Sequence, residues 1–145
     1  MALINYNRSI LTNLRNGVSI PVTSTPRRIM EFGLFIDNPV NFVELLTTVG
    51  WDVTNVETSM GQPNQPTLLL EVRMDGTTVG STTQESISNN EDEPLEMTTK
   101  FQTVLTNVSA GHHVFQVFVS NTQPEQGDIT ISGPANVSGK LIRNS

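Results

Sequence analysis

Alternation of apolar and other residues over NFVELLTTVGWDV, residues 41–53, is the feature that most constrains the fold of this chain. The odd-numbered positions from Val43 to Val53 form one face, and the even-numbered positions from Phe42 to Asp52 form the other. Successive side chains of a β-strand point to opposite faces, whereas a helix would spread these residues around its axis. The segment is therefore predicted to be a half-buried strand whose apolar face a second layer must cover.

The same period of two recurs from Arg28 onward, with turn residues between the runs. It predicts further strands over residues 28–37, 68–74, 77–88, 100–108, 113–121, 128–133 and 136–142. Asp75-Gly76 predicts a tight hairpin, because glycine tolerates the positive φ of a type I′ turn. Residues 109–112 predict a second hairpin-like turn, and Gly133-Pro134 is expected to separate the last two strands. The expected fold class is all-β: an antiparallel β-sandwich or jelly roll over residues 28–145, with an N-terminal extension over residues 1–27.

The composition excludes several classes of partner and chemistry. The 145 residues suffice for one buried core, and the absence of cysteine excludes disulfides and thiolate metal sites. A net charge of -6 without a basic patch argues against nucleic acid as a partner. The opening apolar runs are too interrupted for a signal peptide, and no run approaches the roughly 18 apolar residues of a membrane span. We therefore expect a chain made in a cytoplasm that reaches a surface, if it does, without the general secretion route.

Candidate catalytic and metal-ligating residues are few. His112 and His113 are the only histidines, and neighbours on a strand point to opposite faces, so they are not expected to share a metal. No nucleophile elbow, phosphate-binding glycine loop or His-Glu-x-x-His motif occurs. The acidic residues within 91–96 lack the alternating ligands and central glycine of a calcium loop, which favours a solvated loop. No catalytic residue, metal or cofactor is predicted, and an enzyme is the least favoured class.

The N-terminal segment MALINYNRSILTNLRNGVSIPV, residues 1–22, belongs to a basic part of the chain. Residues 1–28 hold four arginines and no acid, a charge of +4, and the remainder holds 14 acids against four bases, a charge of -10, which together give -6. A basic segment beside an acidic body favours a connector arm that leaves its own domain and docks on the next copy by strand addition. Its docking residues are predicted to be Arg8, Ile10, Leu14, Arg15, Val18 and Ile20. A first strand of the domain itself, or a short helix, remains an alternative for this segment.

Several strands also carry apolar residues on the face opposite the expected core. A two-layer sandwich needs only one apolar face per strand, so the extra residues favour coverage by another subunit. The candidate subunit contacts are Phe42, Leu46, Leu69, Val114 and Phe118.

The runs VELLTTVGWDV, LLLEVRMDGTTVGSTTQ, TTKFQTVLTNVSAGHHVFQVFV and ITISGPANVSGKLI resemble the small jelly-roll proteins of the outer spore layers of endospore-forming bacteria. The resemblance covers roughly residues 28–142 and is to exosporium and spore-appendage proteins, whose fold is similar to complement-type and tumour-necrosis-factor-like trimeric heads. It implies a structural role, homotrimers, and a place on the spore surface beside other spore-surface proteins, after synthesis in the mother cell without a signal peptide. The chain has no collagen-like Gly-X-Y tract and no proline-rich leader, so a collagen-stalked glycoprotein is not expected.

The predicted function is a structural subunit that self-assembles on the spore surface, as trimers that stack into a fibre or layer through the N-terminal arm. Two alternatives are kept. One is a non-enzymatic binding head, adhesin-like or lectin-like, that uses the loops at residues 55–66 and 88–98; the other is a phage or viral fibre component.

Overall fold

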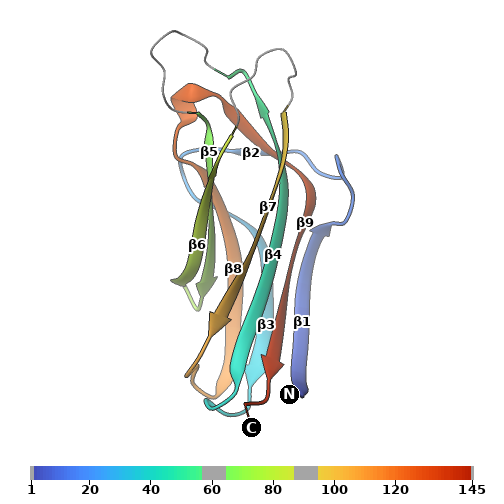
Figure 1. The fold of residues 1–145 in the computed structure, drawn as a ribbon, viewed down its shortest axis with the longest axis vertical. Coiled ribbons are helices and arrows are strands. Elements are labelled where there is room, and N and C mark those ends of the chain that lie inside the picture. Colours follow the sequence, from blue (N-terminus) through green and yellow to red (C-terminus); the bar gives the residue numbers. More distant parts are fainter. Residues whose placement is uncertain (1, 57–64, 87–94, 145) are drawn as a thin grey trace.

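The computed structural model describes residues 2–56, 65–86 and 95–144, which fold into two antiparallel sheets packed face to face (Figure 1). The strands are β1 Leu3–Thr12, β2 Ile20–Val22, β3 Arg27–Ile36, β4 Phe42–Thr54, β5 Thr67–Met74, β6 Thr77–Glu85, β7 Leu95–Leu105, β8 Gly111–Asn121 and β9 Asp128–Ile142. A short 3-10 turn, Pro124–Gln126, precedes β9. Sheet A has the order β1-β9-β4-β7, with β2 paired to the first residues of β9, and sheet B has the order β3-β8-β5-β6.

This arrangement confirms the predicted all-β antiparallel sandwich. Most consecutive strands lie in different sheets, so the connections cross from one layer to the other, as they do in a jelly roll. The first and last strands are neighbours, with Leu3 opposite Ile142. The two layers bury each other's apolar face, which is the reason a chain of this pattern folds as a sandwich.

The core lies between the two sheets and is filled by the residues that the alternation marks. On β4 the fully buried side chains are those of Val43, Leu45, Thr47, Val49, Trp51 and Val53. From sheet B, Leu34, Leu70 and Phe115 are buried against them, and Phe115 stacks on Phe32 with ring centroids 5.4 Å apart. Burial of each large apolar side chain stabilises the fold by about 1.5–3 kcal/mol.

The tight hairpin predicted at Asp75-Gly76 is confirmed. Met74 pairs with Thr77, and both turn residues have positive φ, 50° for Asp75 and 89° for Gly76. This is the backbone of the type I′ turn that the two residue types favour.

Two other predicted connections are wrong. Residues 109–112 do not close a hairpin, because β7 pairs with β4 in sheet A whereas β8 pairs with β3 and β5 in sheet B. Gly133-Pro134 does not end a strand either, since β9 runs through it, and the register of its pairing with β4 shifts between Val49 and Trp51. Alternation and turn residues mark where a strand bends or stops, and they do not say which strand it pairs with.

Candidate functional site

Residues 3–12 of the predicted connector arm form β1, which pairs with β9 of the same chain. The pairing runs from Leu3 opposite Ile142 to Thr12 opposite Ala135. The structure thus places this segment as the edge strand of sheet A, the alternative that the sequence analysis kept beside a free arm. The physical reason is that β9 would otherwise present a row of unpaired main-chain groups, which β1 satisfies.

The predicted docking residues of the arm do not form one surface. Arg8 and Ile10 lie on the outer face of β1, and Leu14, 69% exposed, follows in the connection to β2. Arg15 forms an ion pair with Glu96 of the same chain. Val18 and Ile20 are half-buried and pack against the core.

A second set of β1 side chains, which the sequence analysis missed, closes the gap between the two sheets. Asn5 donates from Nδ2 to the carbonyl of Phe35 at 3.2 Å, and Asn7 does the same to the carbonyl of Gly33 at 2.7 Å. The Oγ of Ser9 accepts a bond of 3.4 Å from the backbone N–H of Glu31. We call this row the β1–β3 seam.

The spacing of the seam was visible in the sequence, because Asn5, Asn7 and Ser9 alternate as one face of a strand does. The contact of these side chains with β3 could not be predicted, because alternating polar residues on a strand ordinarily indicate a face exposed to solvent. In the structure the seam satisfies main-chain groups at the edge of β3, so that edge does not offer them freely to another chain.

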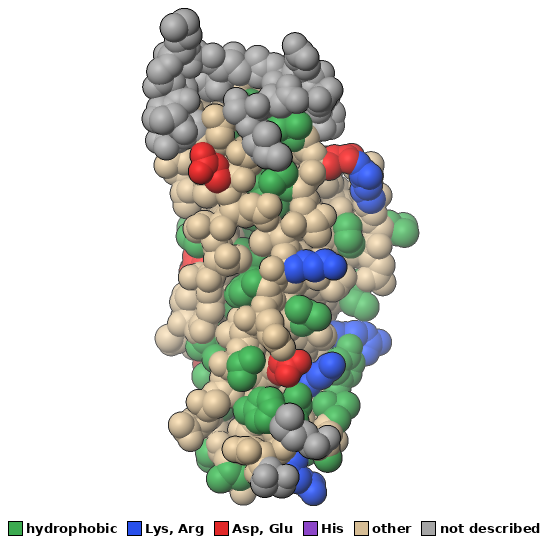
Figure 2. Space-filling view, viewed as in Figure 1, with side chains coloured by type: hydrophobic (Ala, Val, Ile, Leu, Met, Phe, Trp, Pro, Cys, Tyr) green, Lys and Arg blue, Asp and Glu red, His purple; other side chains and the backbone are tan. Residues whose placement is uncertain are grey.

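The outer face of sheet A carries a group of exposed and half-buried apolar side chains, which we call the sheet-A face. The exposed members are Leu3, Tyr6, Ile10, Leu46 and Val104, and the half-buried ones are Phe42 and Ile142, all brought together by the register of β1, β9, β4 and β7. Leu3, Leu46 and Val104 are 58%, 50% and 54% exposed. Figure 2 looks onto this face and shows the apolar side chains interspersed with basic ones.

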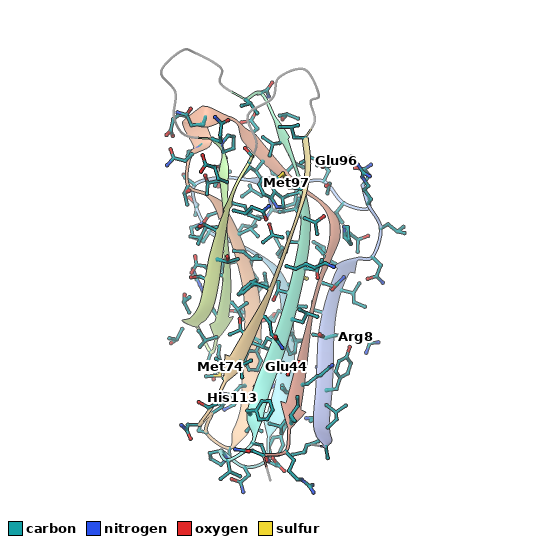
Figure 3. All side chains as sticks on the ribbon, in the orientation of Figure 1. Arg8, Glu44, Met74, Glu96, Met97 and His113 are labelled. Atoms are coloured by element: carbon teal, nitrogen blue, oxygen red, sulfur yellow. The ribbon has the colours of Figure 1, made fainter. Side chains whose placement is uncertain are left out.

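The charges over the central rows of the sheet-A face, from Tyr6 to Ile10 on β1, are mostly basic. Lys140 lies between Tyr6 and Glu44 in the register, and Arg8 lies two residues further along β1, with its guanidinium 5.9 Å from the centroid of the Tyr6 ring. Figure 3 shows Arg8 and Glu44 over the same part of the sheet. Lys100 of β7 adds a further exposed cation.

The predicted subunit contacts fall on opposite sides of the molecule. Phe42 and Leu46 belong to the sheet-A face, whereas Leu69, Val114 and Phe118 lie on the outer face of sheet B. There the Arg73 guanidinium covers the Phe118 ring, 3.9 Å from its centroid. Glu71 holds that guanidinium at 3.4 Å, so Phe118 is less available to another molecule than its sequence position predicts.

His113 and Asp75 are the titratable residues in the described part of the chain whose pKa values are clearly shifted. The His113 side chain is 11% exposed, with Nδ1 2.5 Å from Asp75 Oδ2 and Nε2 2.7 Å from the backbone carbonyl of Ser109. The hydrogen bond from Asp75 raises the pKa of His113 above its usual range, against the effect of burial. The backbone N–H of Val114 and the His113 ring lower the pKa of Asp75. His112, the neighbour on β8, is exposed.

Asp75, His113 and Ser109 are the residue types of a hydrolytic triad, and the Ser109 Oγ lies 3.3 Å from Nε2. Activation of a serine requires a ring nitrogen with a free lone pair. Here Nε2 faces a carbonyl oxygen, which can only accept, so the nitrogen carries a proton and has no lone pair for the hydroxyl. In this arrangement the three groups form a structural hydrogen-bond cluster.

Among the cavities on the described surface, two that lie on sheet A are small for a ligand site, which usually has about 300–1,000 Å³. One, of about 230 Å³, is lined by residues that include Arg15, Asp52 and Glu96. Its charges are already engaged, because Arg15 pairs with Glu96, and Asp52 accepts a bond of 3.0 Å from Ser132. The other, of about 250 Å³, lies along β1 and β9 beside Tyr6 and Arg8.

Parts of the predicted binding loops lie outside the described residues, namely 57–64 and 87–94, and with them most of the acidic cluster within 91–96. Among residues 2–56, 65–86 and 95–144, no group of three His, Asp or Glu side chains is placed to hold a metal ion. Within the same ranges no helix is long and apolar enough to cross a membrane.

The chain matches no protein-family model, and no curated protein matches it. Among solved structures it is similar to the insecticidal delta-endotoxin Cry8Ea1 of Bacillus thuringiensis, with 13% identity, a TM-score of 0.47, and 85% of this chain covering 20% of that one. A Stig cyclase, Fisc, of Fischerella sp. TAU gives 16% identity, a TM-score of 0.46, and coverage of 79% and 57%. Latent PorU of Porphyromonas gingivalis gives 12% identity, a TM-score of 0.48, and coverage of 99% and 13%. The chain thus spans a fifth, just over half and about an eighth of these proteins, and likeness at this level transfers no activity to it.

Proposed function

We propose that this chain is a structural subunit that self-assembles on the surface of a bacterial spore. The subunits form oligomers, as trimers, and stack into a fibre or layer in which the N-terminal segment takes part. The sequence resemblance supports the spore setting and the trimer, and the partners are further copies and other spore-surface proteins.

The observation that carries the proposal is the sheet-A face. Single exposed apolar residues are normal on a soluble protein, but neighbouring ones in register on one sheet indicate a surface that another molecule covers. Tyr6 and Ile10, both exposed, belong to β1, so the N-terminal segment contributes to this face while it stays paired with β9. The main chain of β1 therefore stabilises the fold by pairing with β9, while its outward side chains are available to contact another subunit.

A second copy is the occupant that fits this face best. It carries Arg8, Lys100 and Lys140 against the single acid Glu44 over its central rows, whereas the chain as a whole has a net charge of -6. An apolar surface with a basic surround is attracted to the acidic remainder of another copy. A contact between two different surfaces of the same chain repeats from copy to copy and builds a fibre when it does not close into a ring.

The test is a paired comparison of surface variants. Leu46→Lys combined with Val104→Lys places two charges on the sheet-A face at positions that are 50% and 54% exposed, so the fold should tolerate them. Phe35→Lys combined with Val40→Lys is the matched control, because these residues are 54% and 59% exposed and lie outside that face. Light scattering coupled to size exclusion, and negative-stain microscopy, report the assembly, and far-UV circular dichroism reports the fold.

We expect the unmodified protein and the control pair to form oligomers and filaments, and the Leu46/Val104 pair to remain monomeric and folded. Two results would overturn the proposal. One is an unmodified protein that stays monomeric at high concentration, and the other is a Leu46/Val104 pair that assembles as the control does.

A further inference from the structure

The hydrogen bonds of His113 join two connections that belong to different parts of the fold. Asp75 lies in the turn between β5 and β6, and Ser109 lies in the connection from β7 to β8. Asp75 is also held to β8 by its backbone and by its second carboxylate oxygen, because its N–H donates to the Val114 carbonyl at 2.8 Å and its Oδ1 accepts from the Val114 N–H at 2.9 Å. In Figure 3 His113 lies beside Met74, the residue before Asp75. We call Asp75, His113 and Ser109 the His113 clasp.

The geometry of the clasp favours the charged form of the ring. The carboxylate oxygen of Asp75 and the carbonyl oxygen of Ser109 both lie within hydrogen-bond distance of a ring nitrogen, and both are acceptors. A neutral imidazole has one N–H and can satisfy only one of them, whereas the imidazolium has two and satisfies both. The observed arrangement is that of the charged ring.

We propose that the His113 clasp is a pH-sensitive latch, closed while the ring is charged, which releases the connection at residues 106–110 when the ring loses a proton. The proton leaves Nε2 for solvent, because the carboxylate of Asp75 is the stronger acceptor and keeps the proton on Nδ1. The lone pair of Nε2 then faces the Ser109 carbonyl oxygen at 2.7 Å, which is repulsive. The Ser109 hydroxyl, 3.3 Å from Nε2, becomes the donor that remains once that carbonyl moves away.

Few charged groups lie close enough to influence the protonation of the His113 ring. Asp75 comes from the β5–β6 turn, and His112 of β8 acts on Asp75 through its charge. Residues 106–110, Thr-Asn-Val-Ser-Ala, bring no charged side chain, and neither does β3 over residues 33–36, where Leu34 pairs with His113. The latch therefore depends on one ion pair and one carbonyl.

The direction of the pH effect follows from the two pKa shifts. The pKa of His113 is raised above its ordinary value of 6.5 by the Asp75 hydrogen bond, so the contribution of the clasp is complete below about pH 6.5 and is lost as the pH rises through the folded-state pKa. The pKa of Asp75 is lowered from 3.8, so acid opens the clasp only below that value. The latch is closed between these limits.

Hydrogen exchange followed by mass spectrometry tests the latch in the full chain, whether or not it assembles. Exchange of peptides that cover residues 106–111 is measured across the pH range and corrected for the intrinsic rate. We expect the opening of this connection to increase above pH 6.5, by about tenfold for each unit by which the folded-state pKa exceeds the ordinary one. Peptides from the centre of β4 should show no such step.

Three variants separate the latch from a general loosening. Asp75→Asn should move the step to lower pH, His113→Gln should remove it, and His112→Gln should leave it nearly in place, because His112 acts only on Asp75 and at a distance. Thermal unfolding confirms that each variant is folded. A flat profile at residues 106–111 in the unmodified protein, or the same step in His113→Gln, would overturn the proposal.

Discussion

Trp51 connects the two sheets through a chain of hydrogen bonds, and its replacement by phenylalanine is a direct test of how the sandwich is held on its β6/β7 side. The indole is fully buried, and its Nε1 donates to the Thr99 Oγ1 at 2.9 Å. The Thr99 hydroxyl in turn donates to the Gln84 Oε1 of β6, so one relay links β4 and β7 of sheet A to sheet B. The link is placed where β6 and β7, the edge strands of the two sheets, face each other.

The cost of Trp51→Phe has two parts. Loss of the hydrogen bond costs about 0.5–1.5 kcal/mol, and the space left by the smaller ring costs about 1–2 kcal/mol more, since the larger truncation of Trp to Ala costs about 3–5 kcal/mol. The total, about 1.5–3.5 kcal/mol, is a large part of the stability of about 5–15 kcal/mol that is usual for a domain. It corresponds to a fall in Tm of roughly 5–12 °C for a chain of this size.

Urea unfolding followed by far-UV circular dichroism is the assay, because the variant removes the only tryptophan of the chain. Thr99→Val preserves the shape of the side chain and removes the hydroxyl, which leaves the Trp51 N–H unpaired at a cost of about 1–3 kcal/mol. The two changes interrupt the same bond, so the double variant should lose about 1 kcal/mol less than the sum of the single losses. Additive losses, with a coupling energy below about 0.3 kcal/mol, would refute the relay.

Two further substitutions test the packing of β4 on β9 and the β1–β3 seam. Gly50→Ala would press a Cβ against the backbone carbonyl of Gly133 and within 2.9 Å of the Pro134 nitrogen. Because the obstacle is backbone, we expect a loss of about 3 kcal/mol in urea unfolding, against about 1 kcal/mol or less for Thr48→Ala on the outer face of the same strand; equal losses would contradict the clash. Asn5→Ala combined with Asn7→Ala frees the carbonyls of Phe35 and Gly33, which should cost about 1–3 kcal/mol and promote aggregation at the opened edge of β3. Light scattering during incubation should show the difference from Asn13→Ala, and a double variant as stable and soluble as that control would argue against the seam.

The sequence was sufficient for the layers of this fold and insufficient for its pairings. The alternation from Val43 to Val53 predicts a buried face because period two is a local property, and Asp75-Gly76 predicts its turn for the same reason. Which strands pair is decided by contacts between distant residues, such as Leu3 with Ile142, and no local pattern encodes them. For the same reason the sequence did not predict that Leu46 and Phe118 lie on opposite sides of the molecule, since their strands belong to different sheets.

In the candidate site too, local properties could be predicted from the sequence and contacts between distant residues could not. The charge asymmetry identified residues 1–28 as unusual, but it did not predict the ion pair of Arg15 with Glu96, which is distant in sequence. The His113 clasp was not predictable at all, because Asp75 and His113 meet only once the turn and β8 are in place. The trimer and the fibre are predictions that the assembly experiment tests, and the spore-surface location stays a prediction.

The pairing of β1 with β9 also determines when sheet A can be completed. β1 is synthesised before β9 and pairs with it only after β9 has been made, and β9 is also the link between β1 and β4. Until then sheet A consists of β4 and β7 alone, with the edge of β4 open and much of its apolar surface uncovered. Such a topology folds slowly, in milliseconds to seconds. Nascent chains are therefore open to association through the unpaired edge of β4 until β9 covers that edge and β1 completes the sheet.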